Sequence, residues 1–124
     1  MRFVHIGDCH LGAWRYPELN RLNFQSFQHV INFSIKEKVD FLLIAGDLFD
    51  SAYPSIDTIK EAFNEFRRLK EANIPVFLIA GSHDYSVSGK TFLDVLENAG
   101  LCKNVSVSEE KEGKIILQPT LYGN

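Results

Sequence analysis

Residues 40–47 read Asp-Phe-Leu-Leu-Ile-Ala-Gly-Asp, and residues 75–84 read Pro-Val-Phe-Leu-Ile-Ala-Gly-Ser-His-Asp. Each stretch holds a continuous apolar run that ends in a glycine followed by polar residues. A short run that is apolar on both faces is typical of a strand buried in a parallel sheet. Residues 2–6, Arg-Phe-Val-His-Ile, predict a further strand, which also ends at a glycine, Gly7.

Amphipathic segments separate these strands. Apolar residues recur at helical spacing over about residues 22–38, 55–72 and 89–99. Ser55 is a candidate N-cap, and Gly100 is placed to end the third helix. Buried strands that alternate with helices predict an α/β fold, in which helices on both sides cover a parallel sheet.

The chain continues with a weaker pattern after the third helix. Residues 105–107 and 114–118 predict two shorter strands, and the charged residues 109–114 predict a solvated hairpin turn between them. The length of 124 residues suggests one domain or a piece of one.

Composition limits the possible functions. The net charge of -3 argues against nonspecific binding of nucleic acid through bulk charge, although bound cations would offset the carboxylates of a metal-dependent nuclease. No secretory signal and no membrane-spanning stretch is visible. Cys9 and Cys102 form no paired motif, so we expect two free thiols and a cytoplasmic location, or a nuclear one in a eukaryote.

Polar residues able to bind metals or act in catalysis follow all three buried strands. They are Asp8, His10, Asp47, Ser82, His83 and Asp84. Because the carboxyl ends of parallel strands meet at one edge of a sheet, we expect these side chains to converge there. Each motif alone also fits a surface pair, a turn or a loop cap. Their coincidence at three successive strand ends favours a joint functional site.

The residue types indicate a divalent metal site. On an extended chain Asp8 and His10 point to the same side, and Cys9 points the other way into the structure. Asp47 arrives from the neighbouring strand and can bridge two ions. Mixed oxygen and nitrogen ligands suit manganese, iron or zinc better than calcium. Two ions about 3.5–4 Å apart can clamp a phosphate and activate a water molecule as nucleophile.

The spacing of these motifs resembles a known family. The signature of the calcineurin-like metallophosphoesterases is Asp-x-His, then Gly-Asp, then Gly-Asn-His followed by Asp or Glu, and this sequence offers Asp8-x-His10, Gly46-Asp47 and Gly81-Ser82-His83-Asp84. Within that superfamily, the segments His10-Leu-Gly and Gly-Asp-Leu-Phe-Asp50 resemble the nuclease subunit of double-strand-break repair. The resemblance implies that the sheet is part of a two-sheet sandwich flanked by helices.

The resemblance also implies roles for individual residues. Asp8, His10 and Asp47 match the metal ligands of the family, with Asp47 bridging two divalent ions, most often Mn²⁺. His83 matches a catalytic histidine that stabilises the transferring phosphate or protonates the leaving oxygen. Asp84 would orient His83 by accepting its other ring proton.

Two departures from the family pattern stand out. Ser82 occupies the position of a ligating asparagine, and a hydroxyl is a poorer ligand than an amide carbonyl. The family also supplies a further histidine and a His-x-His pair downstream, whereas the remaining histidines here are His5, expected to pack in the core, and His29, expected to be exposed or half-buried on the first helix. We therefore expect residues 1–124 to be the truncated N-terminal portion of a nuclease domain, inactive alone.

The resemblance further implies partners. It indicates DNA as substrate, exonuclease and single-strand endonuclease activity, an SMC-like ABC ATPase subunit as partner, no membrane, and a homodimer, for which Phe63, Phe66 and Phe92 or Leu93 are candidate contacts. Arg15 and Tyr16 follow the first motif on a loop and are candidates for DNA contact, with a packed surface loop as the alternative. Two other functions stay open: a phosphoesterase for small phosphodiesters or phosphoproteins, and a non-catalytic assembly module.

Overall fold

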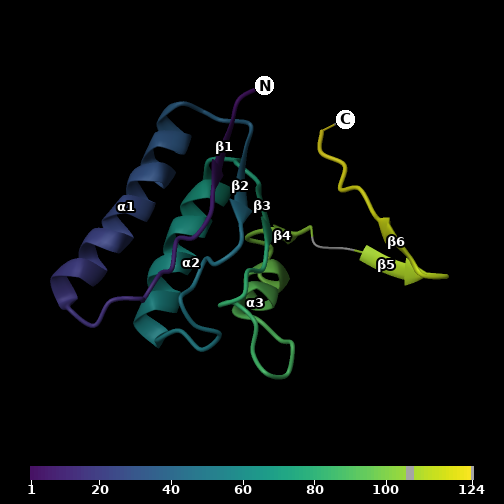
Figure 1. The fold of residues 1–124 in the computed structure, drawn as a ribbon. Helices are drawn as coiled ribbons and strands as arrows, with labels where there is room; N and C mark the ends of the chain where they lie inside the picture. The colour runs from purple at the N-terminus through teal and green to yellow at the C-terminus, as the bar shows by residue number, and fades with distance from the viewer. Residues whose placement is uncertain (106–107, 124) are drawn as a thin grey trace.

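The computed structural model describes residues 1–105 and 108–123 (Figure 1). Its main sheet contains four parallel strands in the order β1 (Phe3–Ile6), β2 (Phe41–Ala45), β3 (Val76–Ile79) and β4 (Lys103–Asn104). The register pairs residues 3–6 with 41–44, and residues 42–45 with 76–79. The expected α/β fold with a parallel sheet flanked by helices is confirmed.

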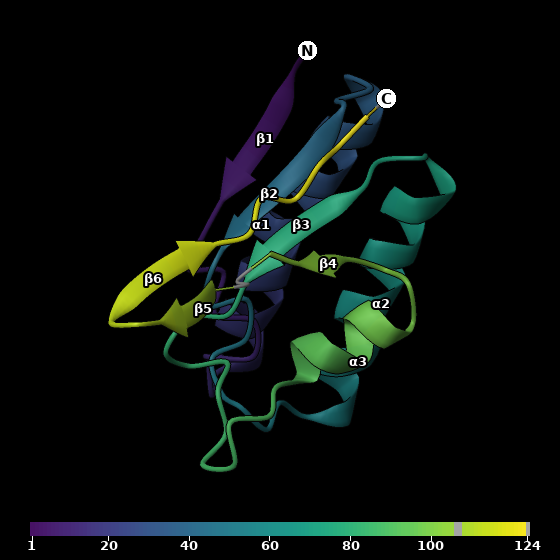
Figure 2. The same cartoon turned by 90° about the vertical axis from the view of Figure 1, so that its right-hand side faces the viewer.

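Three helices connect these strands: α1 (Pro17–Lys36), α2 (Ile56–Glu71) and α3 (Phe92–Asn98). Figures 1 and 2 show α1 and α2 against one face of the sheet, with α3 beside α2 near β4. Successive strands lie next to each other, and right-handed crossovers in a sheet of this order all pass over the same face. The helices of the described chain therefore cover one face, whereas the sequence predicted helices on both.

The hydrophobic core lies between that face and the helices. Alternate strand residues point into it, and the helices contribute their apolar faces. The buried members from strands and helices include Leu42, Ile44, Val76, Leu78, Phe27, Ile31, Ala62, Phe66, Leu69, Leu93 and Leu96. Each large side chain removed from water here contributes roughly 1.5–3 kcal/mol, so this one cluster fixes the sheet and thereby the positions of the strand ends.

The opposite face of the sheet is also apolar, but it is more open. Phe3 is 53% exposed and stacks on Phe41, with ring centroids 5.1 Å apart. The Tyr122 ring contacts Phe41 and Phe77, and its hydroxyl donates to the Asp40 carbonyl at 2.8 Å. His5 lies exposed on β1, so the expectation that it packs in the core is wrong. This face supplies the apolar surface that a second layer of a sandwich requires.

Local signals account for most helix ends. α1 begins five residues before the expected start because Pro17 occupies its first turn, where the missing N–H costs nothing. The Ser55 side chain caps α2 by accepting from the Thr58 N–H, as predicted. A capping box formed by Thr91 and Asp94 begins α3, and Gly100 follows its end with φ of 69°.

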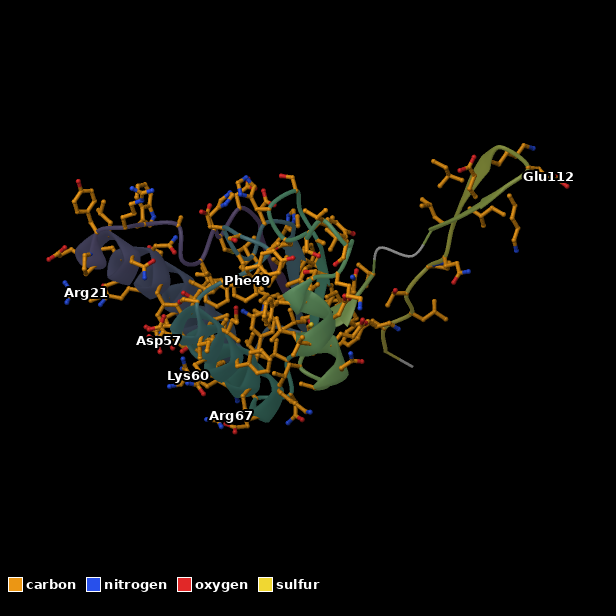
Figure 3. All side chains as sticks on the ribbon, turned by 90° about the horizontal axis from the view of Figure 1, so that it is seen from below. Arg21, Phe49, Asp57, Lys60, Arg67 and Glu112 are labelled. Carbon is orange, nitrogen blue, oxygen red and sulfur yellow. The ribbon has the colours of Figure 1, made fainter. Side chains whose placement is uncertain are left out.

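The last part of the chain forms a separate hairpin. β5 (Ser108–Lys111) pairs antiparallel with β6 (Lys114–Leu117). Glu112 and Gly113 connect the strands with positive φ at both positions, which suits a tight hairpin turn. Figure 3 shows Glu112 at the tip, away from Phe49 in the body of the domain. The strand predicted at 105–107 begins with Val105, which hydrogen-bonds to Leu78, and otherwise lies outside the described residues.

None of the helices in the described ranges is long and apolar enough to cross a membrane.

Candidate metal centre

The segments that follow β1 and β2 stay hydrogen-bonded beyond the ends of the strands. The N–H of Asp8 donates to the Gly46 carbonyl at 3.2 Å, and the N–H of His10 donates to the Asp47 carbonyl at 3.0 Å. One residue further on, Leu11 forms an isolated parallel bridge with Phe49. Backbone pairing alone therefore places His10 beside Asp47.

Asp8, His10 and Asp47 bring three ligand atoms within 4.8 Å of one another. The His10 Nε2 atom lies 4.0 Å from Asp8 Oδ1 and 3.8 Å from Asp47 Oδ2. These distances are too long for hydrogen bonds. They leave room for one shared ion, because two ligands that each lie about 2.0–2.2 Å from an ion are at most about 4.4 Å apart. The three side chains therefore fit a divalent cation by both donor type and spacing.

The backbone of this cluster is left-handed. Asp8, His10 and Asp47 have φ of 51°, 46° and 50°. Such conformations cost of order 1 kcal/mol or more each outside glycine, and they gather at functional sites when the surrounding structure enforces them. The expected extended chain at Asp8 and His10 is therefore wrong. Both side chains still face the cluster, and half-buried Cys9 packs against the core as expected.

Two glycines allow the third strand end to approach Asp47. The backbones of Gly46 and Gly81 face each other, and a Cβ on Gly81 would collide with the Asp47 carboxylate and main-chain nitrogen. Two residues after Gly81, the N–H of His83 donates to Asp47 Oδ1 at 2.9 Å. The loop after β3 thus wraps around the Asp47 carboxylate and leaves its Oδ2 atom facing His10.

A second cluster adjoins the first and contains a residue to which the sequence motifs assigned no role. Asp50, His10 and His83 also bring three ligand atoms within 4.8 Å of one another. Asp50 Oδ1 lies 3.1 Å from His10 Nδ1, and the Asp50 main-chain carbonyl lies 2.9 Å from His83 Nδ1. The sequence signal that could have identified Asp50 was its position, since it is an acidic residue directly after the buried pair Leu48 and Phe49 at the same sheet edge.

His83 is exposed and surrounded by acceptors. Its pKa is raised above the ordinary histidine value, first by the hydrogen bond to the Asp50 backbone and then by the nearby carboxylates of Asp47, Asp50 and Asp84, while desolvation lowers it. The ring is perpendicular to that of His10, with centroids 4.9 Å apart. With Nδ1 engaged by Asp50, the Nε2 atom is the nitrogen that remains for a substrate.

Asp84 does not orient His83 in this structure, contrary to the sequence-based prediction. Its side chain is buried, and its carboxylate accepts from the N–H groups of Leu48 at 3.3 Å, Phe49 at 3.0 Å and Gly81 at 2.9 Å. Adjacent side chains in a turn diverge, so Asp84 points into the protein while His83 points out. Asp84 therefore joins the loops that follow β2 and β3.

Ser82 lies between the two residues that contact Asp47. It is exposed, with Gly81 packed on the Asp47 carboxylate before it and His83 bonded to that carboxylate after it. The backbone thus brings Ser82 to the site, and its role as a weak ligand stays a prediction.

The remaining predicted surface residues have mixed outcomes. Arg15 and Tyr16 are exposed at the start of α1, which leaves their proposed role untested. His29 is exposed, as expected. Phe66 and Leu93 are fully buried in the core of this chain, so they cannot serve as contacts between copies. The other two candidate contacts, Phe63 and Phe92, are partly buried.

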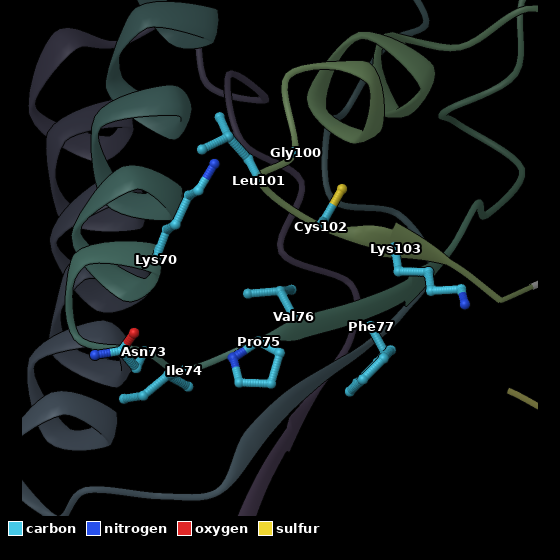
Figure 4. A pocket seen from close by; sticks show the side chains of 10 residues that line it. All are labelled: Lys70, Asn73, Ile74, Pro75, Val76, Phe77, Gly100, Leu101, Cys102 and Lys103. Carbon is cyan, nitrogen blue, oxygen red and sulfur yellow. The ribbon is translucent and has the colours of Figure 1, made fainter. Parts of the chain in front are cut away.

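A pocket of about 430 Å³ lies elsewhere, between the end of α2 and the starts of β3 and β4 (Figure 4). Lys70 and Lys103 stand at its sides, and Ile74, Val76 and Phe77 contribute apolar walls. It adjoins the amino ends of the strands, whereas ligands of open α/β sheets bind at the carboxyl ends. The metal-capable side chains belong to the opposite edge, so this pocket is not part of the candidate centre.

The sequence is similar to known phosphoesterases and DNA-repair proteins. The profile of the calcineurin-like phosphoesterase family matches residues 1–119. The chain is 36% identical over 125 residues to the DNA double-strand break repair protein Mre11 of Methanosarcina acetivorans, covering 99% of this chain and 20% of that protein. It is 41% identical over 97 residues to Mre11 of Methanococcus maripaludis, covering 74% of this chain and 26% of that protein.

A bacterial relative carries a broader description. The uncharacterized metallophosphoesterase YhaO of Bacillus subtilis is 33% identical over 136 residues, covering 99% of this chain and 33% of that protein. The 124 residues thus span about a fifth to a third of the length of these relatives.

Proposed function

The chain belongs to the calcineurin-like phosphoesterase family, and from this membership we propose that it forms the amino-terminal part of a metal-dependent DNA nuclease that acts in double-strand-break repair. The observation that carries the proposal is the convergence of Asp8, His10 and Asp47 at a spacing suited to a shared divalent ion. The similarity to Mre11 proteins supports DNA as the substrate class.

We propose that the site takes two divalent ions, with manganese as the preferred metal. Asp8, His10 and Asp47 hold the first ion, and Asp47 bridges to the second, which Ser82 contacts weakly. When bound, such ions neutralise phosphate charge and lower the pKa of a coordinated water. Four protein ligands, or three and water, are needed for each ion, so we expect residues 1–124 expressed alone to bind manganese weakly and to leave DNA uncut.

The protein's own groups then act on the phosphodiester. The raised pKa of His83 favours the protonated ring, in which Nδ1 donates to the Asp50 carbonyl and Nε2 can donate to a phosphate oxygen or to the leaving oxygen. Hydrolysis adds water across the P–O bond, giving a phosphate monoester and a free hydroxyl. We propose exonuclease activity and endonuclease activity on single strands.

The proposal includes partners for the complete protein. Exposed Arg15 and Tyr16 lie at the start of α1, where an Arg can contact the DNA backbone and a Tyr can stack on an unpaired base. We further propose an SMC-like ABC ATPase as partner and a homodimer in which the partly buried Phe63 and Phe92 contribute to the contact.

Parallel assays test the proposal. The complete protein is incubated with Mn²⁺ and either linear duplex DNA, single-stranded circles, a small phosphodiester or a phosphopeptide. We expect cleavage of both DNAs, and Asp47→Asn should abolish it, whereas Asp57→Asn, an exposed change on the first turn of α2, should not. Hydrolysis of only the small substrates would contradict the nuclease assignment. Absence of all hydrolysis with retained dimerisation would favour an assembly module.

A further inference from the structure

The two nitrogens of the His10 ring face different groups. Nε2 faces the carboxylates of Asp8 and Asp47 at 4.0 and 3.8 Å, whereas Nδ1 lies 3.1 Å from Asp50 Oδ1. The 3.1 Å contact between Nδ1 and Asp50 is a hydrogen bond, whereas the separations of 4.0 and 3.8 Å at Nε2 are too long for one. In a neutral imidazole one nitrogen carries the proton and the other offers a lone pair. The environment of His10 therefore discriminates between its two tautomers.

We infer that Asp50 is a positioning residue for the metal site, because its carboxylate holds the His10 proton on Nδ1 and so directs the Nε2 lone pair toward Asp8 and Asp47. This inference rests on the proposed function in one respect, that Asp8, His10 and Asp47 bind the metal. Asp50 itself does not need to touch the ion. A ring nitrogen is available to a metal when it is unprotonated, and a hydrogen bond at the other nitrogen favours that tautomer.

The fold holds Asp50 firmly enough for this role. Its N–H donates to the Leu11 carbonyl at 3.2 Å, next to the bridge between Leu11 and Phe49. The preceding N–H groups, of Leu48 and Phe49, donate to the Asp84 carboxylate. The segment that carries Asp50 is thus anchored by the segment after β1 on one side and by the loop after β3 on the other.

Asp50 also links the metal site to His83, but through its main chain. The His83 Nδ1 donates to the Asp50 carbonyl at 2.9 Å, while the distance from the same nitrogen to Asp50 Oδ1 is 3.8 Å. A substitution of the Asp50 side chain therefore removes the acceptor of His10 and keeps the acceptor of His83. This asymmetry gives an internal control within one variant.

Two measurements on the complete protein test the inference. Two-bond ¹H–¹⁵N spectra of the metal-free protein report the tautomer of each neutral histidine ring, and calorimetric titration with Mn²⁺ reports metal affinity. The variants are Asp50→Ala, which removes the acceptor, Asp50→Asn, which keeps an acceptor oxygen without the charge, and Asp57→Asn as a matched control on an exposed carboxylate.

We expect His10 to carry its proton on Nδ1 in the parent and to shift toward Nε2–H in Asp50→Ala, while His83 stays unchanged. Affinity for Mn²⁺ should fall about 10–100-fold in Asp50→Ala, by less in Asp50→Asn, and not at all in Asp57→Asn. An unchanged His10 tautomer in Asp50→Ala overturns the inference, even if affinity falls, because loss of charge alone would then suffice. A shifted tautomer with unchanged affinity overturns the link to metal binding.

The same data separate this inference from the proposed function. If the parent binds no Mn²⁺, the metal assignment fails, and the tautomer of His10 in the Asp50 variants still decides whether Asp50 positions the ring. If Asp50→Ala does not fold, as judged by circular dichroism, Asp50→Asn supplies the decision: the inference predicts an affinity for Mn²⁺ between those of the parent and a His10→Ala variant, and an affinity equal to that of the parent overturns it.

Discussion

Asp84 accepts a hydrogen bond from the backbone N–H of Phe49 at 3.0 Å, and this contact joins the segment after β3 to the segment after β2. The same carboxylate accepts from Leu48 and Gly81, and it is 1% exposed. Two buried donors and one half-buried donor therefore depend on one side chain. Asp84 lies beneath the candidate metal centre and fixes the two loops that supply Asp47 and His83.

We predict that Asp84→Ala is severely destabilising. Each buried N–H left without an acceptor costs about 1–3 kcal/mol, so the free energy of unfolding should fall by about 3 kcal/mol or more. Asp84→Asn keeps one acceptor oxygen and should lose less. Urea denaturation measures both, with Asp57→Ala as a surface control. Equal stability of Asp84→Ala and the control would contradict the role given to this carboxylate.

Gly81→Ala should damage the metal centre through backbone displacement. A Cβ at this position meets the main-chain nitrogen and carboxylate of Asp47, so the two loops must separate. We expect a loss of about 1–3 kcal/mol in stability together with weaker manganese binding. Gly113→Ala is the comparison: its left-handed φ of 72° adds strain without a steric neighbour. It should cost stability alone and leave the affinity for manganese unaffected.

His83→Ala in the complete protein should separate catalysis from metal binding. The ring faces the site from an exposed loop and bonds to Asp50, and removal of a group that donates to the phosphate or leaving oxygen lowers rates by about 10²–10⁴. Calorimetry should give an affinity for manganese close to that of the parent. A parallel loss of affinity and rate would make His83 a metal ligand instead.

Cys102 should be slow to react with alkylating reagents. Burial, followed by the nearby Glu97 carboxylate, raises the pKa of its thiol to about 12, compared with 9.0 for a free cysteine. Because the thiolate is the reactive form, a raised pKa lowers reactivity at every pH below it, by about 10²–10³ at pH 8. Mass spectrometry after timed iodoacetamide treatment of a Cys9→Ser variant measures this rate, and denaturation in urea should restore it. Rapid labelling of the folded protein would contradict the burial of this thiol.

The sequence predicted those parts of the fold that depend on local pattern. The continuous apolar runs in residues 41–45 and 76–79 identify buried strands, and Ser55 marks the start of α2. Apolar periodicity predicts a start of α1 near Leu22, which is too late because the first turn, from Pro17, lacks that periodicity. The side of the sheet that the helices cover depends on strand order, which local pattern does not specify.

The candidate site likewise has a part that local sequence pattern predicts and a part that depends on non-local contacts. The convergence of Asp8, His10 and Asp47 could be predicted because each follows the end of a strand, and parallel strands bring such ends together. The partner of His83 could not be predicted. Sequence adjacency suggested Asp84, whereas His83 contacts the Asp50 carbonyl. A left-handed turn and the bridge between Leu11 and Phe49 bring that carbonyl to His83. Such contacts arise from non-local backbone geometry.

The most direct test of the central claim is the position of bound manganese. Crystals of the complete protein grown with Mn²⁺ and measured at the manganese absorption edge give an anomalous difference map that locates the ion without assumptions about its ligands. We predict a peak within coordination distance of His10 Nε2 and of the Asp8 and Asp47 carboxylates. A peak coordinated instead by His10 Nδ1 and Asp50, or the absence of any peak at this sheet edge, would contradict the account.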